Sequence, residues 1–526
     1  MLVISNIRQS VDKSDNDAIE AAVSRLGRLK SECERAVIVR KGVDARRKNV
    51  THVYSVGIFL KGGEKAEIAA EKKVEGASLR REFELSIPKV SPKAGMKRPV
   101  VCGFGPAGMF AALVLARAGL CPVVLERGAD ADARTAAVEA YNRTGRLDIN
   151  TNIQFGEGGA GTFSDGKLTT RIGSPVCEFV LKTFAAHGAP DEILYLAKPH
   201  IGTDILTEVV KSIRREIIAL GGEVRFLCRA EKIITKSGRV AGVLTADGEL
   251  GTDTLILAAG HSARDMYEHI YESGISIVSK PFSVGFRIEH LREDIDAAMY
   301  GRFAGHKNLK SAEYQLSYRE GERGVYTFCM CPGGEVVAAS SEEGAFVVNG
   351  MSRHARDGVN SNSAVVVSVS AGDFGDAGPL SGMYFQRRLE KNAYLTARGC
   401  APVSTLGAYM KTGQSTFTRV NPSIRFKTRE TDISALFPAH IDEFLKRGIT
   451  AFEKNIRGFS APHAAVTGIE TRTSAPVRII RDETRRSPDV SGLYPCGEGA
   501  GYAGGIMSAA VDGVNTAMCI LKSLEG

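Results

Sequence analysis

The N-terminal part of the chain alternates between short apolar stretches and one helical pattern, which predicts a small α/β unit. A capping-box pair, Ser14 and Asp17, marks the expected start of the helix. The predicted elements are a strand at LVISNI (2–7), a helix at AIEAAVSRL (18–26), and strands at AVIVRKGVDARR (36–47) and THVYSVGIFL (51–60). Because residues 86–99 are rich in proline and basic residues, we expect a domain over 1–90 and a linker over 91–98.

From residue 99 onward, apolar strands alternate with helical segments, as in a parallel α/β domain. The clearest pieces are VCGFGPAG with the following AALVLARAG and CPVVLERG (101–128), a helix at 204–220, and a meander that ends in the strand DTLILAAGH (253–261). This alternation is lost between about 270 and 470, and the last residues return to a glycine-rich pattern. The sequence therefore predicts a mixed α/β and α+β chain in which a β-rich substrate domain (271–470) interrupts a Rossmann-like domain (99–270 and 471–526).

The composition of this 526-residue chain is that of an ordinary globular protein, with 43% hydrophobic and 24% charged residues. A net charge of +8 over this length does not by itself argue for nucleic acid. The ten cysteines are scattered, with no C-x-x-C and no zinc-like spacing, so we predict no metal site. The N-terminus has no secretory pattern and the apolar stretch 99–125 is broken by glycine and proline, which favours a cytoplasmic protein without a membrane span.

The stretch VCGFGPAG carries the glycine fingerprint of a dinucleotide site. Gly103 allows a tight turn, Gly105 lets the backbone approach a pyrophosphate, and Gly108 lets the helix pack closely on the strand. The pyrophosphate then lies at a helix N-terminus, beside Pro106 and Ala107. At the end of the next strand, Glu126 is placed to accept hydrogen bonds from the adenosine ribose, which favours an unphosphorylated ribose although Arg127 follows it.

The C-terminal stretch GLYPCGEGAGYAGGIMSAAVDG (492–513) indicates that the dinucleotide is FAD. It predicts a strand that ends in a glycine turn with an acidic residue, followed by a helix whose small-residue N-terminus can face the flavin pyrimidine and stabilise negative charge there. A nicotinamide cofactor needs no second site of this kind. The predicted contacts of this stretch are Gly497, Glu498, Gly504, Gly505 and Ile506.

Two further segments are expected to lie beside the same cofactor. In QFGEGGAGTFSDGKL (154–168), glycines allow backbone amides to crowd a ligand, although a surface loop is the alternative. The strand-end turn of DTLILAAGH resembles the point where many flavoproteins return the chain to FAD. From these and the adjoining meander, the predicted contacts are Gly161, Ser164, Asp165, Gly166, Lys167, Ala230, Ala259 and Gly260.

Together these motifs resemble a family of bacterial FAD-dependent dehydrogenases of unassigned reaction, commonly labelled NAD(P)/FAD-dependent oxidoreductases. The resemblance also covers VDARRKN with THVYSV, YTFCMCPGGEVV (326–337), VNGMSRHARDGVNSNSA (348–364) and GIETRTSAPVRI (468–479), so it runs over nearly the whole chain. It implies a glutathione-reductase-like FAD domain, an inserted substrate domain and a small N-terminal domain. Where related flavoproteins usually have Gly-Asp at the ribityl chain, this sequence has Gly497-Glu498.

Outside the cofactor contacts, the predicted catalytic residues are His354, as a proton donor, and Arg472, as an anchor for a carboxylate or for the flavin edge. For His354 the alternative is a surface histidine, and for Arg472 it is a structural ion pair with Glu470. Cys329 and Cys331 are the closest cysteine pair, and on an extended strand they would share one face; buried small hydrophobes are favoured over a redox pair.

The leading functional hypothesis is hydride transfer between a small organic substrate and flavin N5. NAD(P)H would dock transiently, because the second glycine string, GAGYAG (499–504), only opens the predicted flavin helix. A flavin monooxygenase is the nearest alternative. RNA binding by a basic cluster in the N-terminal unit is less favoured, since no aromatic residues interleave it; its members are Arg40, Lys41, Arg46, Arg47 and Lys48. Substrate identity, electron donor and oligomeric state stay open.

Overall fold

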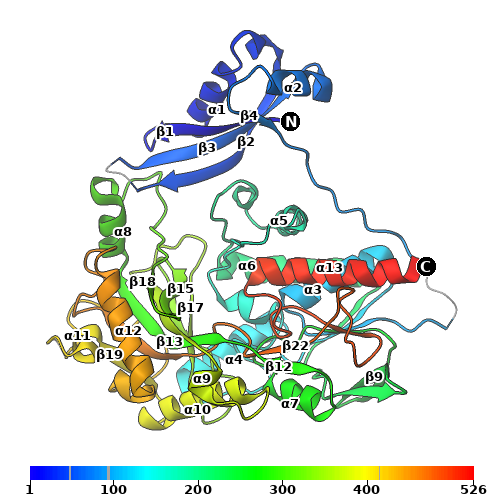
Figure 1. Cartoon of the computed structure of the whole chain (residues 1–526), viewed down its shortest axis with the longest axis vertical. Coiled ribbons are helices and arrows are strands. Elements are labelled where there is room, and N and C mark those ends of the chain that lie inside the picture. Colours follow the sequence, from blue (N-terminus) through cyan, green and yellow to red (C-terminus); the bar gives the residue numbers. More distant parts are fainter. Residues whose placement is uncertain (47–48, 92–94, 414, 526) are drawn as a thin grey trace.

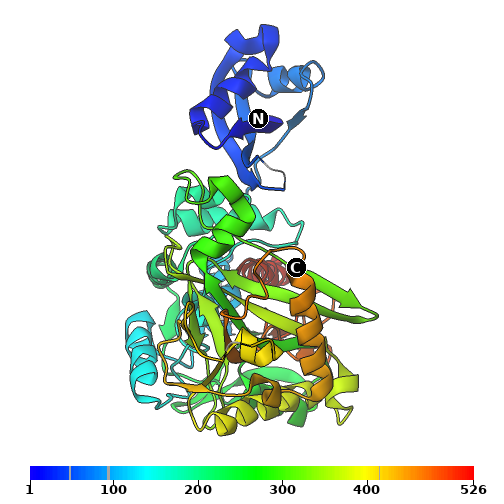
Figure 2. The ribbon, with the colours of Figure 1, turned by 90° about the vertical axis from the view of Figure 1, so that its left-hand side faces the viewer.

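The computed structural model describes residues 1–46, 49–91, 95–413 and 415–525. Figure 1 shows a small N-terminal sheet with its helices, a region with a parallel sheet beside the C-terminal helix, and a larger sheet built from the middle of the chain. A long segment without regular structure joins the small sheet to the parallel one. In the side view of Figure 2 the N-terminal unit stands apart from the rest of the molecule.

The N-terminal unit is a four-stranded antiparallel sheet in the order β2-β3-β1-β4, with two helices in a β-α-β-β-α-β sequence. The predicted capping box forms, because Ser14 and Asp17 each accept a hydrogen bond from the other's backbone N–H. Alternating residues of β3 are buried against the helices, as its sequence pattern predicts. The elements are β1 (Leu2–Ser10), α1 (Asp15–Ser24), β2 (Cys33–Asp44), β3 (Thr51–Leu60), α2 (Gly63–Glu71) and β4 (Ala77–Leu79).

The edge strand of this unit contacts the rest of the chain. The backbone N–H of Lys41 in β2 donates to the carbonyl oxygen of Tyr195 at 2.8 Å, and the carbonyl of Lys41 accepts from Ala197 at 2.8 Å. The side chain of Asn308 also donates to the carbonyl oxygen of Val11 at 2.8 Å. The N-terminal unit is therefore fixed to the body through a few polar contacts.

The second part is a five-stranded parallel sheet in the order β23-β11-β5-β6-β7. Its strands are β5 (Val100–Cys102), β6 (Val123–Leu125), β7 (Glu223–Arg225), β11 (Leu255–Leu257) and β23 (Leu493–Pro495). Strand β23 comes from the C-terminal end of the chain, so the sheet joins segments that lie far apart in the sequence. The associated helices are α3 (Pro106–Ala118), α4 (Ala131–Thr144), α5 (Val176–Ala186), α6 (Thr203–Ala219), α7 (Arg264–Glu272) and α13 (Ile506–Glu525).

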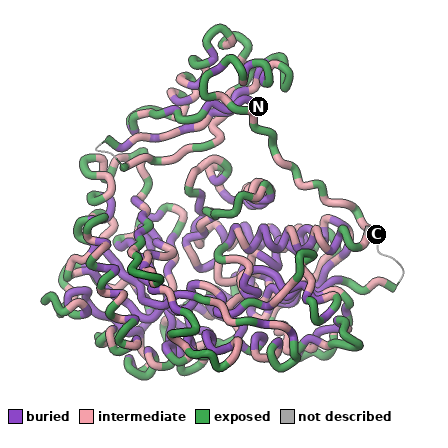
Figure 3. The backbone as a smooth tube through the Cα atoms, viewed as in Figure 1, coloured by how far each residue is buried: buried purple, intermediate pink, exposed green. Residues whose placement is uncertain are grey.

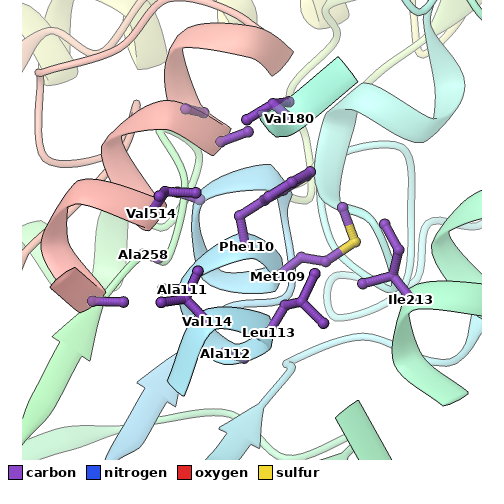
Figure 4. Packing of buried hydrophobic residues seen from close by; sticks show 14 of the residues in the cluster. Met109, Phe110, Ala111, Ala112, Leu113, Val114, Val180, Ile213, Ala258 and Val514 are labelled. Atoms are coloured by element: carbon purple, nitrogen blue, oxygen red, sulfur yellow. The ribbon is translucent and has the colours of Figure 1, made fainter. Parts of the chain in front are cut away.

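Helix α3 is apolar on all sides and lies at the centre of the largest hydrophobic cluster. Figure 4 shows its side chains from Met109 to Val114 between Val514 of α13, Val180 of α5 and Ile213 of α6. In the burial view of Figure 3, α3 and α13 lie in one of the buried regions of the body. This packing holds the start of α3 against the C-terminal segment.

The third part is a seven-stranded mixed sheet in the order β14-β15-β18-β13-β21-β19-β20. Its strands are β13 (Phe282–Leu291), β14 (Ser317–Glu320), β15 (Arg323–Cys331), β18 (Asn360–Val369), β19 (Ala401–Thr405), β20 (Thr428–Glu430) and β21 (Ala465–Glu470). Helices α8 (Arg292–Tyr300), α9 (Ala371–Phe374), α10 (Ser381–Thr396), α11 (Leu406–Met410) and α12 (Ala439–Phe452) accompany it. The loss of β-α alternation in this part of the sequence reflects this change of architecture.

Three smaller sheets of described residues accompany the large ones. One is a three-stranded antiparallel sheet that precedes β11, and the other two are two-stranded antiparallel pairs. These strands are β8 (Lys232–Lys236), β9 (Arg239–Thr245), β10 (Gly248–Gly251), β12 (Ile277–Ser279), β16 (Glu335–Ala338), β17 (Val348–Met351) and β22 (Val477–Ile479). The mixed α/β class is confirmed, while the glutathione-reductase-like details and the domain limits stay predictions.

Among the described residues, no helix is both long and apolar enough to cross a bilayer.

The contact between α3 and α13 predicts the effect of a substitution at Gly513. A Cβ atom there would lie 2.1 Å from the carbonyl oxygen of Ala107, so Gly513→Ala should destabilise the protein by about 1–3 kcal/mol through overpacking. Chemical denaturation would measure this change. The matched control is Gly372→Ala, since a Cβ at Gly372 would have the Ser370 Oγ as its nearest neighbour, 3.9 Å away. Equal stability of the Gly513 variant and wild type would contradict the close contact.

Candidate active site

A cavity of about 520 Å³ lies where the carboxyl ends of the parallel strands meet the seven-stranded sheet. Its walls come from the glycine turn after β5, the turn after β11, the loop 154–168, the start of α13 and the ends of β15 and β21. Crevices at the carboxyl ends of parallel strands are the usual ligand sites of such sheets. The cavity therefore brings together segments from both ends of the chain.

Most of the predicted cofactor residues line this cavity. Gly108 and Gly497 do not, because both lie behind the wall in close packing. The predicted residues that line it are Gly103, Gly105, Pro106, Ala107, Glu126, Arg127, Gly161, Ser164, Asp165, Gly166, Lys167, Ala230, Ala259, Gly260, Glu498, Gly504, Gly505 and Ile506. Arg472 also lines it.

The glycine turn after β5 needs glycine at two positions. Gly103 has φ +99°, and a Cβ there would lie 2.4 Å from the carbonyl oxygen of Ala258 in the neighbouring strand-end turn. A Cβ at Gly108 would lie 1.9 Å from the carbonyl oxygen of Gly103. Helix α3 starts at Pro106 directly after this turn, so its first backbone N–H groups have no partner within the helix.

Glu126 holds three backbone segments at one end of the cavity. Its carboxylate accepts hydrogen bonds from the backbone N–H groups of Phe104 at 2.8 Å, Gly156 at 2.8 Å and Gly128 at 2.9 Å. The residue is 5% exposed. Each carboxylate oxygen can accept more than one hydrogen bond, so these contacts leave the carboxylate with further acceptor capacity.

Arg127 is held by a neighbouring acid rather than left free for a phosphate. Its guanidinium donates to both carboxylate oxygens of Asp265 at 2.6 and 2.7 Å and lies 4.4 Å from the ring centroid of Phe155. The Arg127 guanidinium is therefore occupied within the protein, and the unphosphorylated ribose stays a prediction.

The loop 154–168 lies between the starts of α3 and α13. A Cβ at Gly159 would lie 2.9 Å from the Cα of Gly105, and one at Gly161 would lie 3.1 Å from Ile506. Fully buried Arg134 supports this loop by donating to the carbonyl oxygens of Asn152, Ile153 and Glu157 at 2.6–2.9 Å. Arg134 was not predicted, because a single arginine outside any motif gives no sequence signal.

Asp165, predicted as a cofactor contact, is the centre of an ion-pair cluster. Its carboxylate accepts from Lys167 at 2.6 Å and from both Arg356 and Ser352. Burial alone would raise the pKa of Asp165, but the positive charges of Lys167 and Arg356 outweigh it. They hold the pKa of Asp165 well below its ordinary value. The loop is thereby tied to the connection between β17 and β18.

The C-terminal segment packs directly on the start of α3. Gly497 has φ +77°, and a Cβ there would lie 2.6 Å from the Cβ of Ala107. Buried Asp512 accepts from the backbone N–H of Gly497 at 2.8 Å and from the guanidinium of Arg481 at 2.7 and 2.9 Å. Asp512 and Arg481 were not predicted, although they position this turn.

Glu498 presents a carboxyl group to the cavity without a hydrogen bond from any described residue. Burial raises the pKa of Glu498 to about 7, although the positive charge of Lys280 opposes the shift. Next to it, Gly504, Gly505 and Ile506 lead into α13, whose first N–H groups lack partners within the helix. This end of the cavity therefore combines an acidic side chain with a helix N-terminus.

The opposite wall comes from the seven-stranded sheet. It presents Thr327, Phe328, Cys329 and Met330 at the end of β15, and Glu470 at the end of β21. Lys198, Glu313, Tyr314 and Gln315 continue this wall. The wall mixes apolar, polar and charged groups.

The structural pair between Glu470 and Arg472, which was the alternative to a functional role of Arg472, does not form, because each side chain has another buried partner. Glu470 binds Arg287, which donates to it at 3.0 Å through Nη2 and a second time through Nε. Arg472 donates to Glu390 at 2.8 and 3.1 Å, and Arg264 donates to the same carboxylate at 2.8 and 3.0 Å. The two side chains diverge because Glu470 is the last residue of β21, whereas Arg472 lies beyond the end of the strand.

These contacts also bear on the predicted catalytic residues. Arg472 donates further to Ser262 and Ser341, so its guanidinium is largely satisfied within the protein. His354 does not line the cavity; its Nδ1 lies 3.0 Å from the carbonyl oxygen of Ile201 and its ring stacks on His200. The placement of His354 gives no support to proton transfer to a molecule in the cavity.

Among the described residues, no three His, Cys, Asp or Glu side chains are arranged to hold a metal ion.

The two cysteines at the end of β15 differ from the expected extended geometry: Cys329 lines the cavity, whereas Cys331 is fully buried behind it. A bulge in the pairing of β15 with β18 lies between Phe328 and Cys331 and accounts for the difference.

Comparison with known proteins identifies the relatives of this chain. A family model described as "FAD-dependent protein, C-terminal domain-like" matches residues 281–473. A protein of Clostridium beijerinckii, described as uncharacterized, is 46% identical over 530 residues, which cover 99% of each chain.

Solved structures show more distant similarity. The flavin-dependent brominase Bmp2 has a TM-score of 0.38 at 13% identity, covering 82% of this chain and 80% of that one. Glycine oxidase from Bacillus cereus has a TM-score of 0.30 at 10% identity, covering 81% and 95%. Similarity this distant says nothing about the reaction.

The matching family model places the chain in the class of FAD-dependent proteins. Within that class, the chain belongs to the same family as the Clostridium beijerinckii relative.

The shared carboxylate of Glu390 predicts a large effect of its neutralisation. Glu390 is fully buried between Arg264 and Arg472, so Glu390→Gln leaves buried Arg472 without its carboxylate partner and Arg264 with Glu342 alone. We expect a loss of about 3–5 kcal/mol in the free energy of unfolding, measured by chemical denaturation. The exposed Glu249→Gln is the control, and a loss no larger than in this control would contradict the assignment.

The raised pKa of Glu498 predicts a pH-dependent stability. A carboxyl group whose folded pKa is raised stabilises the fold fully below its unfolded pKa, and this contribution is lost as the pH rises through about 7. Glu498→Gln cannot ionise, so its melting temperature relative to wild type should rise between pH 4.5 and pH 7. Thermal unfolding of flavin-free protein across this range would measure the difference. A constant difference would show that the Glu498 pKa is not raised.

Proposed function

We propose that this protein transfers hydride between a small organic substrate and the N5 atom of bound FAD. The observation that carries the proposal is the single cavity lined both by the glycine turn after β5 and by the start of α13. FAD is long enough to need both: a pyrophosphate site at one helix start and a site for the flavin ring elsewhere. The hydride chemistry belongs to the flavin, and the protein supplies binding, orientation and electrostatics.

The residues of the glycine turn fit the ADP half of FAD. The unpartnered N–H groups at the start of α3 can donate to the pyrophosphate, and the glycines at 103 and 105 keep side chains out of its path. Glu126 lies at the end of the neighbouring strand, where it can accept from the ribose hydroxyls. Ala259, Gly260 and Ala230 complete this side of the cavity with small residues.

The residues near α13 fit the flavin half. The positive end of a helix of this length favours negative charge on the pyrimidine side of the ring. Because burial raises the pKa of Glu498 to about 7, its carboxyl group can keep a proton next to the ring and ribityl chain. Phe328 and Met330 of the facing wall help to exclude water from the space left for a substrate.

The electron donor is proposed to be NAD(P)H docking transiently or the substrate itself. The GAGYAG string leads into α13, which packs on α3, so it serves the same cavity rather than a second nucleotide domain. A flavin monooxygenase would use the same cofactor site and differs only in incorporating oxygen into the product.

RNA binding has little support in the N-terminal unit. Lys41 donates to Asp15 at 2.7 Å and Arg46 donates to Asp44 at 2.8 and 2.9 Å, so two members of the basic cluster are paired. Arg47 and Lys48 lie outside the described residues. Such pairing lowers the positive potential that a nucleic acid would require.

A substitution at Glu126 tests the FAD site. Loss of one charge-assisted hydrogen bond weakens binding by about 1.5–3 kcal/mol, so Glu126→Gln should raise the Kd for FAD about ten- to hundredfold. Flavin fluorescence during titration of the apoprotein would measure it. Glu139→Gln, an exposed glutamate of α4, is the control. Unchanged affinity of the Glu126 variant would argue against the proposed ribose contact.

The reaction itself is tested by anaerobic stopped-flow absorbance of the reconstituted protein. Flavin bleaching by NADH, NADPH or a member of a metabolite panel would identify the donor, and oxygen incorporation during turnover would indicate a monooxygenase. Protein that stays colourless after reconstitution with FAD would overturn the proposed function.

A further inference from the structure

Of the described cysteines, only Cys329 and Cys331 combine close spacing with a position at the cavity wall. Cys329 faces the cavity, and Cys331 lies directly behind it with no exposed surface. The Sγ of Cys331 lies 3.3 Å from the carbonyl oxygen of Cys329, so its sulfur is folded back against its neighbour's backbone. One thiol is therefore accessible from the cavity and the other is shielded.

The local backbone departs from an extended strand at this pair. On a regular strand, residues two apart lie about 6.6–6.8 Å apart, which is at the upper limit of the roughly 4.4–6.8 Å between the Cα atoms of a disulfide. Between Phe328 and Cys331, however, three residue steps of β15 lie opposite two steps of β18. The segment that contains both cysteines is thus contracted relative to an extended strand.

Charged groups around the pair favour a reactive Cys329. The guanidinium of Arg287 donates to the carbonyl oxygen of Cys329 at 2.8 Å. A hydrogen bond from Cys331 lowers the pKa of Cys329, and the nearby Arg287 and Lys167 act in the same direction against burial and Asp165. The same hydrogen bond and burial raise the pKa of Cys331. The accessible thiol is therefore the one that forms a thiolate more readily.

The pair also lies close to the proposed flavin half of the cavity. Cys329 is near enough to Glu498 and Glu470 to contribute to the raised pKa of each carboxyl group. Glu498 adjoins the start of α13, where the ring is proposed to bind. Cys329 and the proposed ring site thus belong to one end of the cavity, and Cys331 lies behind Cys329.

We propose that Cys329 and Cys331 form a redox-active dithiol–disulfide pair that exchanges an electron pair with FAD and with a small disulfide substrate. When the sulfur–sulfur bond forms, both S–H bonds break, and two electrons and two protons reduce one oxidised FAD; the reverse step regenerates the dithiol. Toward the substrate, the Cys329 thiolate attacks one sulfur of a disulfide and releases the first thiol. Cys331 then displaces the second thiol and leaves the protein disulfide. The inference rests on the proposed FAD site for its electron partner.

Counting electrons in the holoprotein tests the pair. An anaerobic dithionite titration should consume two electron pairs per FAD in wild type, one for the flavin and one for the disulfide. Cys329→Ser and Cys331→Ser should each consume only one pair, whereas Cys400→Ser, which does not line the cavity, should behave as wild type. One pair per FAD in fully oxidised wild type would overturn the proposal.

Mapping of thiols provides a readout that does not depend on bound flavin. Protein treated with oxidised glutathione, alkylated, and digested should yield a peptide with a Cys329–Cys331 bond that disappears after reduction by dithiothreitol. Recovery of both cysteines as alkylated thiols under these conditions would overturn the proposal even if FAD binds. A colourless protein that still forms this bond would instead overturn the proposed function and leave the thiol pair in place.

Discussion

The close packing of the start of α3 against the C-terminal segment is the contact on which the rest of the site depends. Ala107 meets Gly497 and Gly513 at distances that leave no room for a side chain at either glycine. This contact holds the helix that follows β5 against the segment that follows β23, a strand from the other end of the chain. The cavity lies beside this contact. Strands β15 and β21 belong to the separate seven-stranded sheet, so they supply a wall to the cavity without taking part in that contact. The cavity is thus lined by turns of the parallel sheet on one side and by the seven-stranded sheet on the other.

Much of the parallel sheet could be predicted from the sequence because its signals are local. The turn at Gly103, the helix after it and the acid at Glu126 follow one another within a short stretch, and each has a defined backbone or hydrogen-bonding reason. The contribution of the C-terminal helix was also predictable, since the small residues before Ile506 form a recognisable pattern. These residues line the cavity together, although their contacts with FAD stay predictions.

The buried charge network could not be predicted in the same way. Glu390 lies on α10, far in sequence from Arg264 and Arg472, and no local pattern links the three. The closeness of Glu470 and Arg472 in the sequence suggested an ion pair between them. Because β21 ends at Glu470, the two side chains reach different partners instead. Similarly, the bulge near Cys329 depends on pairing with β18, so an extended-strand model placed both thiols on one face. Long-range partners decide these features, and a single sequence does not contain them.

The attachment of the N-terminal unit has a mechanical consequence. The backbone bridge from Lys41 ends at Ala197, and the next residue, Lys198, is part of the cavity wall. The hydrogen-bonded joint between the small sheet and the body therefore lies one peptide unit away from the cavity wall. A displacement of the small sheet would act on the backbone next to that wall, even though none of its described residues is part of the lining.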